Sequence, residues 1–303
     1  MPALEVRDLR KAYGPVRALE GVTLSVGKGE IYGLLGRNGA GKTTLVKILL
    51  SIVRPSSGEA RLLDRPVSDP AARERVGYLP EDHRFPDYHT AESALDYYGA
   101  LSGVPGDERR RRIPELLKRM ELTDASARKI RTYSKGMKQR LGLAQALLHD
   151  PDVIFLDEPT DGVDPVGRKQ VRELLLDLKT RGKTIFLNSH LLSEVELICD
   201  RVGIMEKGRL VKEGTVESLT ARANVFEVRV EGPVDAAWPE LLALVPGASR
   251  SGDLLALPLG EGKSVDPVID LLRAKGVSVR GVSEKRRSLE DIFIDTVTEP
   301  PKG

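Results

Sequence analysis

The sequence has few of the features that mark secreted or membrane-spanning chains. Its single cysteine, Cys199, cannot form an internal disulfide and suits a reducing compartment. The amino terminus lacks the order of charged, apolar and small residues found in a signal peptide. No apolar run approaches the roughly eighteen residues that a spanning helix needs. We therefore expect a chain that neither spans a membrane nor is exported by a signal peptide, so that any role at a membrane depends on a partner.

The chain also lacks a strong excess of charge of one sign. Its 47 Lys and Arg residues against 45 Asp and Glu residues give a net charge of +2, so no nucleic-acid partner is expected. One charge run, 107–112, is explained most simply as the solvated start of a helix, with a phospholipid or RNA contact as the alternative. The length of 303 residues and the hydrophobic content of 40% allow two domains with ordinary packed cores.

The stretch 36–43 fits the phosphate-loop pattern of Gly, four residues, Gly, Lys and then Ser or Thr. An apolar strand is expected before it, at 30–35, and a helix after it, at 44–50, which is the context that the motif requires. Backbone N–H groups and the helix N-terminus should then face the phosphates of a nucleoside triphosphate. We expect Lys42 to reach the β- and γ-phosphates and the Thr43 hydroxyl to ligate Mg²⁺. The residues predicted to hold the nucleotide are Gly36, Arg37, Asn38, Gly39, Ala40, Gly41, Lys42, Thr43 and Thr44.

Polar residues follow two further runs that are expected to form buried strands. Asp157 and Glu158 follow the apolar run 153–156, and His190 ends the run 183–190. Ligands bind outside the carboxyl ends of the strands in an open α/β sheet. Asp157 is therefore the expected Mg²⁺ partner, and Glu158 is placed to polarise an attacking water. His190 is expected to contact the γ-phosphate. The alternative for the two acids is that they cap a helix.

The rest of the first two thirds of the chain predicts a mixed architecture. Alternating patterns over 3–9 and 19–26 predict an antiparallel hairpin. Tyr13 lies in its turn region, where the ring can stack on adenine or simply anchor the loop. Apolar spacings of three and four residues predict a helical insertion from about 90 to 149, and 202–211 predicts a final hairpin.

With these motifs in order, residues 1–218 closely resemble the nucleotide-binding subunit of ATP-binding cassette (ABC) transporters. The stretch 133–140, Tyr-Ser-Lys-Gly-Met-Lys-Gln-Arg, sits where that family has its signature, usually Leu-Ser-Gly-Gly-Gln-Gln-Arg. Ser134 and Gly136 are kept, whereas Lys135 and Met137 depart from the pattern. As a bare string, an ordinary serine helix cap is the alternative. The resemblance implies an α/β fold: a P-loop NTPase cassette with an antiparallel β subdomain and a helical subdomain at about 85–150.

The resemblance also implies an assembly and further site residues. Two cassettes, identical or different, stack head to tail around two Mg-ATP, each ATP held by the phosphate loop of one chain and the signature of the other. Tyr13 aligns with the adenine-stacking aromatic, His190 with the switch histidine, and Asp161 and Asp164 with a loop that crosses the dimer interface. Glu81 stands where the family usually has glutamine, in a loop that touches both Mg²⁺ and the membrane subunit, and can still ligate the metal. The signature residues expected to touch the partner's ATP are Ser134, Lys135, Gly136 and Met137.

The remaining residues, 219–303, predict a small α+β accessory or regulatory domain. Strand patterns at 225–230, 254–257 and 277–279 alternate with helical patterns, and the last helix is expected at 289–296. This tail resembles the one in exporters of the drug-resistance, sodium-extrusion and copper-maturation type. The implied protein is an ATPase at the cytoplasmic face of the cell membrane, peripheral, that drives transport, export rather than import, through a separate integral-membrane permease.

Two other functions are compatible with a cassette. One is a protein that acts on ribosomes or DNA, although such relatives usually carry two cassettes or a long coiled coil. The other is a sensor that uses ATP only as a dimerisation signal, which the presence of Glu158 and His190 disfavours. ATP turnover distinguishes the sensor from the transporter subunit.

Overall fold

The computed structural model describes residues 1–220, 222–259 and 263–298. Contacts divide the chain into two compact units, which are treated separately below. The first is Met1–Val216 together with the chain from Thr296, and the second is Glu217–Asp295. Within the predicted tail domain, residues 221, 260–262 and 299–303 lie outside the described residues.

The first unit is built on a six-stranded sheet in the order β10-β9-β3-β8-β7-β6. Strands β6, β7, β8, β3 and β9 are parallel, and β10 is antiparallel to β9. Every residue of β7 and β8 is buried, as expected for apolar strands in a sheet covered on both faces. The strands are β3 (Ile31–Gly36), β6 (Val76–Leu79), β7 (Val153–Asp157), β8 (Thr184–Asn188), β9 (Arg201–Glu206) and β10 (Arg209–Thr215).

A second sheet of the first unit has the order β2-β1-β4-β5. Its strands are β1 (Leu4–Tyr13), β2 (Val16–Val26), β4 (Ser57–Leu62) and β5 (Arg65–Pro66). The predicted amino-terminal hairpin is confirmed, since β1 and β2 pair antiparallel from one end to the other. Helix α1 (Lys42–Leu49) buries its apolar side chains in one core with this sheet and with Phe155 and Phe186 of the six-stranded sheet. The helix that follows the phosphate loop is thus fixed from both sides.

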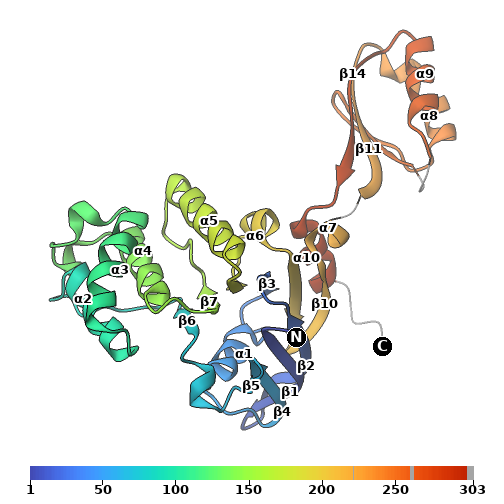
Figure 1. Ribbon diagram of the computed structural model, residues 1–303. Helices are drawn as coiled ribbons and strands as arrows, with labels where there is room; N and C mark the ends of the chain where they lie inside the picture. The colour runs from blue at the N-terminus through green and yellow to red at the C-terminus, as the bar shows by residue number, and fades with distance from the viewer. Residues whose placement is uncertain (221, 260–262, 299–303) are drawn as a thin grey trace. The chain divides into compact units, whose positions relative to one another are not determined.

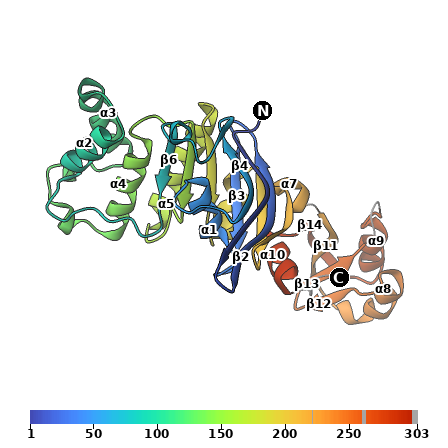
Figure 2. The ribbon, with the colours of Figure 1, turned by 90° about the horizontal axis from the view of Figure 1, so that it is seen from below.

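The predicted helical insertion is confirmed as α2 (Ala91–Leu101), α3 (Gly106–Arg119) and α4 (Lys135–Leu147), which lie together at one side of the sheet (Figures 1 and 2). Helix α3 begins at Gly106, in agreement with the prediction that the charge run 107–112 is the start of a helix. The apolar spacing marks only its buried residues, Ile113 and Leu117, whereas its first turn is held by Arg109, whose Nε lies 2.7 Å from an Asp96 carboxylate oxygen.

The other helices of the first unit are α5 (Pro165–Thr180) and α6 (Leu192–Ile198), and α7 (Val216–Leu219) spans the boundary. Short 3₁₀ turns occur at Pro70–Ala72, Thr123–Ala125, Ile130–Thr132 and, in the second unit, Val234–Ala236. Across the described ranges, no helix is both long and apolar enough to cross a membrane.

The second unit is a four-stranded antiparallel sheet, in the order β12-β13-β11-β14, with helices α8 and α9 on one face (Figure 1). Val228, Leu255 and Leu257 of the sheet share a buried core with Leu241 of α8 and Leu272 of α9. The small α+β unit that the tail predicts is therefore confirmed as a fold. Its elements are β11 (Arg222–Glu231), α8 (Trp238–Leu244), β12 (Ser249–Ser251), β13 (Leu254–Pro258), α9 (Asp266–Ala274), β14 (Ser278–Arg286) and α10 (Leu289–Thr298), which runs past the unit's end.

Candidate nucleotide-binding site

A cleft of about 710 Å³ lies over the phosphate loop in the first unit. It brings together segments that are far apart in the sequence: the start of β2, the phosphate loop and the start of α1, the loop after β6, and the ends of β7 and β8. Most of the predicted nucleotide residues therefore share one cleft. Its lining residues are Val16, Arg17, Ala18, Asn38, Gly39, Ala40, Gly41, Lys42, Thr43, Thr44, Glu81, Glu158, Asn188 and His190.

The phosphate loop needs its glycines for two different reasons. Gly39 and Gly41 both have left-handed backbones, with φ of 82° and 104°, which side chains other than glycine rarely adopt. A Cβ added to Gly41 would also lie 2.5 Å from the Ala18 carbonyl oxygen. Gly41 precedes α1 and no side chain caps that helix, so its first backbone N–H groups remain for an anionic ligand.

Lys42 folds back over the loop. Its ammonium donates to the Gly36 carbonyl at 2.6 Å. Burial lowers the pKa of Lys42, and the negative charges of Glu158, Asp157 and Glu81 act in the opposite direction. The lysine is thus a positive charge among three acids, in a position to receive the phosphates of a ligand.

Asp157 is 3% exposed at the end of β7. Burial is the main cause that raises its pKa, and the hydrogen bond from Asn188, 2.5 Å from Nδ2 to Oδ1, opposes the rise. The nearby charges of Asp157 and Glu81, after burial, help to raise the pKa of Tyr78 to about 12. Asn188 pairs with Asp157 across β7 and β8, and its own Oδ1 is buried without a hydrogen-bond partner.

These residues fit a magnesium ion that arrives with a nucleotide. The Thr43 hydroxyl and the carboxylates of Asp157 and Glu81 are oxygen donors, which Mg²⁺ prefers, and the unpartnered Asn188 oxygen adds an acceptor beside them. Among the described residues, no three His, Cys, Asp or Glu side chains form a group that could hold a metal by themselves. That agrees with the usual magnesium site of nucleotide enzymes, in which phosphate oxygens and waters complete the shell.

Glu158 is held in a strained and well-fixed position. Its backbone is left-handed, with φ of 51°, which is costly outside glycine and collects at functional sites. The Oε2 atom lies 2.8 Å from Nδ1 of His190 and accepts from the Ser189 hydroxyl at 3.3 Å. The helix-capping alternative fails, because the next helix begins at residue 165 and is capped by Asp164, which accepts from the Gly167 amide at 2.7 Å.

The signature residues lie outside this cleft. Ser134 caps α4, accepting from the Met137 amide at 3.2 Å, so the cap that the bare string allowed is present. Lys135 contacts Asp161, 2.6 Å from Nζ to Oδ2, and this ion pair lowers the pKa of Asp161. The signature and the Asp161 loop are thus in contact within one chain.

Tyr13 also falls outside the lining of the cleft. It ends β1 with 46% of its surface exposed, and the Lys11 ammonium lies 4.8 Å from its ring centroid. The structure brings Val16 and Arg17 of the same hairpin into the cleft instead. The ring of Tyr13 remains accessible for stacking.

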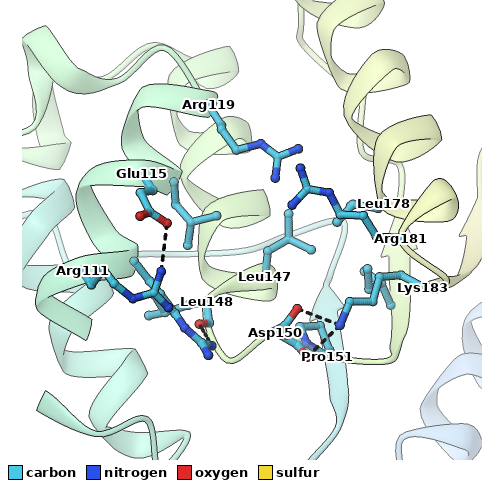
Figure 3. A pocket seen from close by; sticks show the side chains of 13 residues that line it. Arg111, Glu115, Arg119, Leu147, Leu148, Asp150, Pro151, Leu178, Arg181 and Lys183 are labelled. Carbon is cyan, nitrogen blue, oxygen red and sulfur yellow. Dashed lines mark hydrogen bonds and ion pairs between the residues drawn. The ribbon is translucent and has the colours of Figure 1, made fainter. Parts of the chain in front are cut away.

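The basic run of α3 borders a second, smaller hollow of about 250 Å³ between α3, α4 and α5 (Figure 3). Its floor is apolar, with Leu147 and Leu178 among its residues. Each cation of its rim has a carboxylate partner, and these cations include Arg111 and Arg112 of the basic run. The pairs are Arg111–Glu115, Arg112–Glu108, Lys183–Asp150, Arg119–Asp177 and Arg181–Asp177.

A strand, a glycine-rich loop and a helix in a parallel sheet, with acids at the end of another strand of that sheet, define a P-loop nucleoside triphosphatase. The chain belongs to the family of ABC transporter ATP-binding proteins. The family model described as ABC transporter matches residues 19–161.

Similar proteins match nearly the whole chain. It is 43% identical to an uncharacterised ABC transporter ATP-binding protein of Synechocystis sp., over 94% of this chain and 79% of that protein. It is 39% identical to the Nod factor export ATP-binding protein I of Paraburkholderia xenovorans, over 96% of each. Identity to the daunorubicin resistance ATP-binding protein DrrA3 of Streptomyces coeruleorubidus is 34%, over 96% of this chain and 95% of that one.

Solved structures match a smaller share of the chain. An ATP-binding subunit of an ABC transporter superposes with a TM-score of 0.67 at 32% identity, covering 72% of this chain and 91% of that one. A dimeric ATP-binding cassette, bound to ADP and Pi in a post-hydrolysis state, gives a TM-score of 0.65 at 25% identity, covering 70% and 98%.

The chain is therefore the ATP-binding subunit of an ABC transporter, an ATPase that uses ATP and Mg²⁺. The predicted family and fold class are confirmed. Among the similar solved structures, one cassette is a dimer, and another, from Clostridium perfringens, is part of an ABC transporter complex.

Proposed function

We propose that this chain drives export, with its hydrolytic chemistry carried by Glu158 in the cleft over the phosphate loop. Two observations support the direction of transport: relatives that match 96% of this chain are a Nod factor export protein and a daunorubicin resistance protein. The observation that carries the chemistry is the buried Glu158 carboxylate, fixed by Ser189 and His190 in the same cleft as Lys42.

The roles follow from the charges and contacts. Lys42 and the backbone of residues 39–43 bind the phosphates, and Tyr13 stacks on the adenine. Glu158 takes a proton from the attacking water, and the 65%-exposed side chain of His190 holds the γ-phosphate. The remaining phosphate-loop residues, Gly36, Arg37, Asn38 and Thr44, shape the loop and add donors.

Thr43 and Asp157 hold Mg²⁺, and Glu81 adds a third oxygen donor at the rim of the cleft. The ion, when bound, neutralises charge on the phosphates. Glu81 brings a negative charge where a neutral amide is usual. This charge acts to raise the pKa values of Asp157, Lys42 and Tyr78.

Two copies of this chain close around two ATP molecules. Ser134, Lys135, Gly136 and Met137 form the N-terminal end of α4, which offers backbone donors to the phosphates of the partner's ATP. The loop from Asp161 to Asp164 joins this end through the Lys135–Asp161 pair and crosses the interface. A heterodimer with a second cassette would place the same residues against a different partner.

The chain is divided into a cassette at 1–218 and an accessory domain at 219–303. The accessory domain has a regulatory or dimer-contact role. The assembled cassettes act at the cytoplasmic face of the cell membrane, bound to a separate integral-membrane permease. No contact with nucleic acid is part of the proposal.

Affinity purification tests the assembly. The tagged chain is expressed in its native host, membranes are solubilised gently, and the co-purifying proteins are identified by mass spectrometry. A multi-span protein without a cassette of its own is the expected partner. The complex is then reconstituted in vesicles, and the movement of candidate substrates across the vesicle membrane gives the direction of transport. Recovery of ribosomes or soluble proteins alone would leave the ATPase assignment standing and overturn the transport role of this chain.

A further inference from the structure

Gln139 is a buried polar residue that lies in the signature-like stretch 133–140 but was given no role in the predicted site. Gln139, on α4, is only 3% exposed. Its Nε2 donates to the backbone carbonyl oxygen of Glu158 at 2.9 Å. A buried amide is costly unless it is hydrogen-bonded, so this contact determines where the side chain can sit.

The carbonyl that Gln139 contacts belongs to the strained residue of the site. Glu158 has a φ of 51°, and three hydrogen bonds hold its backbone in that state. Its amide donates to the Asn188 carbonyl at 2.9 Å, and its carbonyl accepts from the Asp161 amide at 3.1 Å as well as from Gln139. Strained backbone of this kind persists only where surrounding contacts over-determine it.

We propose that Gln139 is a positioning residue for ATP hydrolysis, which couples helix α4 to the Glu158 carboxylate. The proposal rests on the role of Glu158 proposed above. The Gln139 bond fixes the peptide unit after Glu158, and the position of that unit sets where the carboxylate lies relative to His190. Removing the bond lets the backbone relax and the carboxylate drift from the attacking water.

The position of Gln139 on α4 gives this bond a second consequence. The same helix is capped by Ser134, at the end that faces the partner's ATP in the proposed dimer. A rigid helix transmits a displacement of its first turn to the residue one turn further on. Through Gln139, the Glu158 backbone is thus bonded to the helix whose first turn faces the partner's ATP in the proposed dimer.

Steady-state ATP hydrolysis by the full-length Gln139→Met variant tests the positioning role. Methionine keeps the length and helix propensity of glutamine but cannot donate. We expect kcat to fall about ten-fold, the usual worth of one hydrogen bond, while KM for ATP changes by less than about two-fold, because ground-state binding is untouched. Gln145→Met, on the half-buried side of the same helix, is the matched control and should keep the parental kcat.

A double-mutant cycle with Glu158→Gln separates positioning from general destabilisation. If Gln139 acts through the Glu158 carboxylate, adding Gln139→Met to Glu158→Gln should change the residual rate by less than about two-fold, since residues that act as a unit are not additive. Equal fold-losses in both backgrounds, or a parental kcat in Gln139→Met, would overturn the proposal. Gln139→Leu replaces the methionine variant if that one fails to fold, and failure of both would replace the positioning role with a folding role.

The same cycle distinguishes the proposed role of Glu158 from the positioning role of Gln139. A Glu158→Gln variant that still turns over ATP at the parental rate contradicts the proposed function itself. An inactive Glu158→Gln together with a fully active Gln139→Met contradicts only the positioning role.

Discussion

His190 Nδ1 lies 2.8 Å from Glu158 Oε2, although the two residues are the ends of different segments of the chain. The parallel register of β7 and β8 brings them together: Asp157 pairs with Asn188, so the residues that follow each strand emerge side by side. The Glu158 side chain is 11% exposed and the His190 side chain 65% exposed. The Glu158 carboxylate is thus shielded from solvent, as the proposed general base should be, and the exposed His190 ring is in contact with it.

Glu158→Gln should bind Mg-ATP with nearly unchanged affinity and lose hydrolysis. Loss of a general base costs on the order of a hundred- to ten-thousand-fold in rate, and the amide keeps the size and a hydrogen bond to Ser189. Because closure no longer ends in hydrolysis, the variant should accumulate as an ATP-bound dimer. Phosphate release and size-exclusion chromatography with ATP measure the two effects. Parental turnover, or a monomer in saturating ATP, contradicts the assignment.

His190→Ala should slow hydrolysis less than the loss of the base, by about ten- to a hundred-fold, because the carboxylate remains but one of its two side-chain contacts is gone. ATP affinity in the presence of Mg²⁺ should change little. Single-turnover hydrolysis and equilibrium nucleotide binding check this split. A variant whose only defect is weaker ATP binding would show that His190 holds the γ-phosphate in the ground state and takes no part in the chemical step.

Gly41→Ala should destabilise the nucleotide-free chain more than Gly39→Ala does. Both alanines would be strained by a left-handed backbone. Only the Cβ at 41 meets an atom, the Ala18 oxygen at 2.5 Å, whereas the space around a Cβ at 39 is open. Overpacking of that kind costs about 1–3 kcal/mol, and the difference between the two free energies of unfolding in urea measures it. Equal losses would show that the loop moves to admit the methyl group.

Local patterns were sufficient to predict much of the fold. The apolar runs that became β7 and β8 are buried over their whole length, so a continuous hydrophobic run identified them. The first turns of helix α3 carry no apolar spacing, and only the charge run 107–112 indicated a helix start there. Its start depends on tertiary contacts such as Arg109 with Asp96, which no local window contains.

Three residues around the site were given no role from the sequence: Asn188, Ser189 and Gln139. Asn188 and Ser189 directly precede His190 and could have been suspected from that position alone. Gln139 lies in the signature-like stretch 133–140, but its own role was not predicted, because its partner is a backbone carbonyl on another segment. The strain at Glu158 was equally invisible, because a left-handed φ at a glutamate is imposed by surrounding contacts.

Asp157→Asn should make the nucleotide-free chain more stable at neutral pH. Burial raises the pKa of Asp157, and the charges of Glu81 and Glu158 act in the same direction. The folded state therefore binds this proton more tightly than the unfolded state, so stability falls as pH rises above the ordinary aspartate pKa. In urea unfolding, the free energy of unfolding of the variant should exceed that of the parent by an amount that grows between about pH 4 and pH 7. Mg²⁺-dependent ATP hydrolysis should be lost. An advantage that does not grow with pH would contradict this origin.

Trp238, the single tryptophan of the chain, allows the two units to be followed separately. It lies in α8 and packs on the core of the second unit. Leu272→Ala removes a fully buried side chain from that core and should cost about 2–5 kcal/mol. The Trp238 fluorescence transition should then move to lower urea while Mg-ATP affinity is kept. Leu45→Ala, equally buried but in the first unit, should weaken ATP binding and leave the Trp238 transition in place. If both variants moved the tryptophan transition alike, the units would unfold as one domain and the division near residue 218 would be wrong.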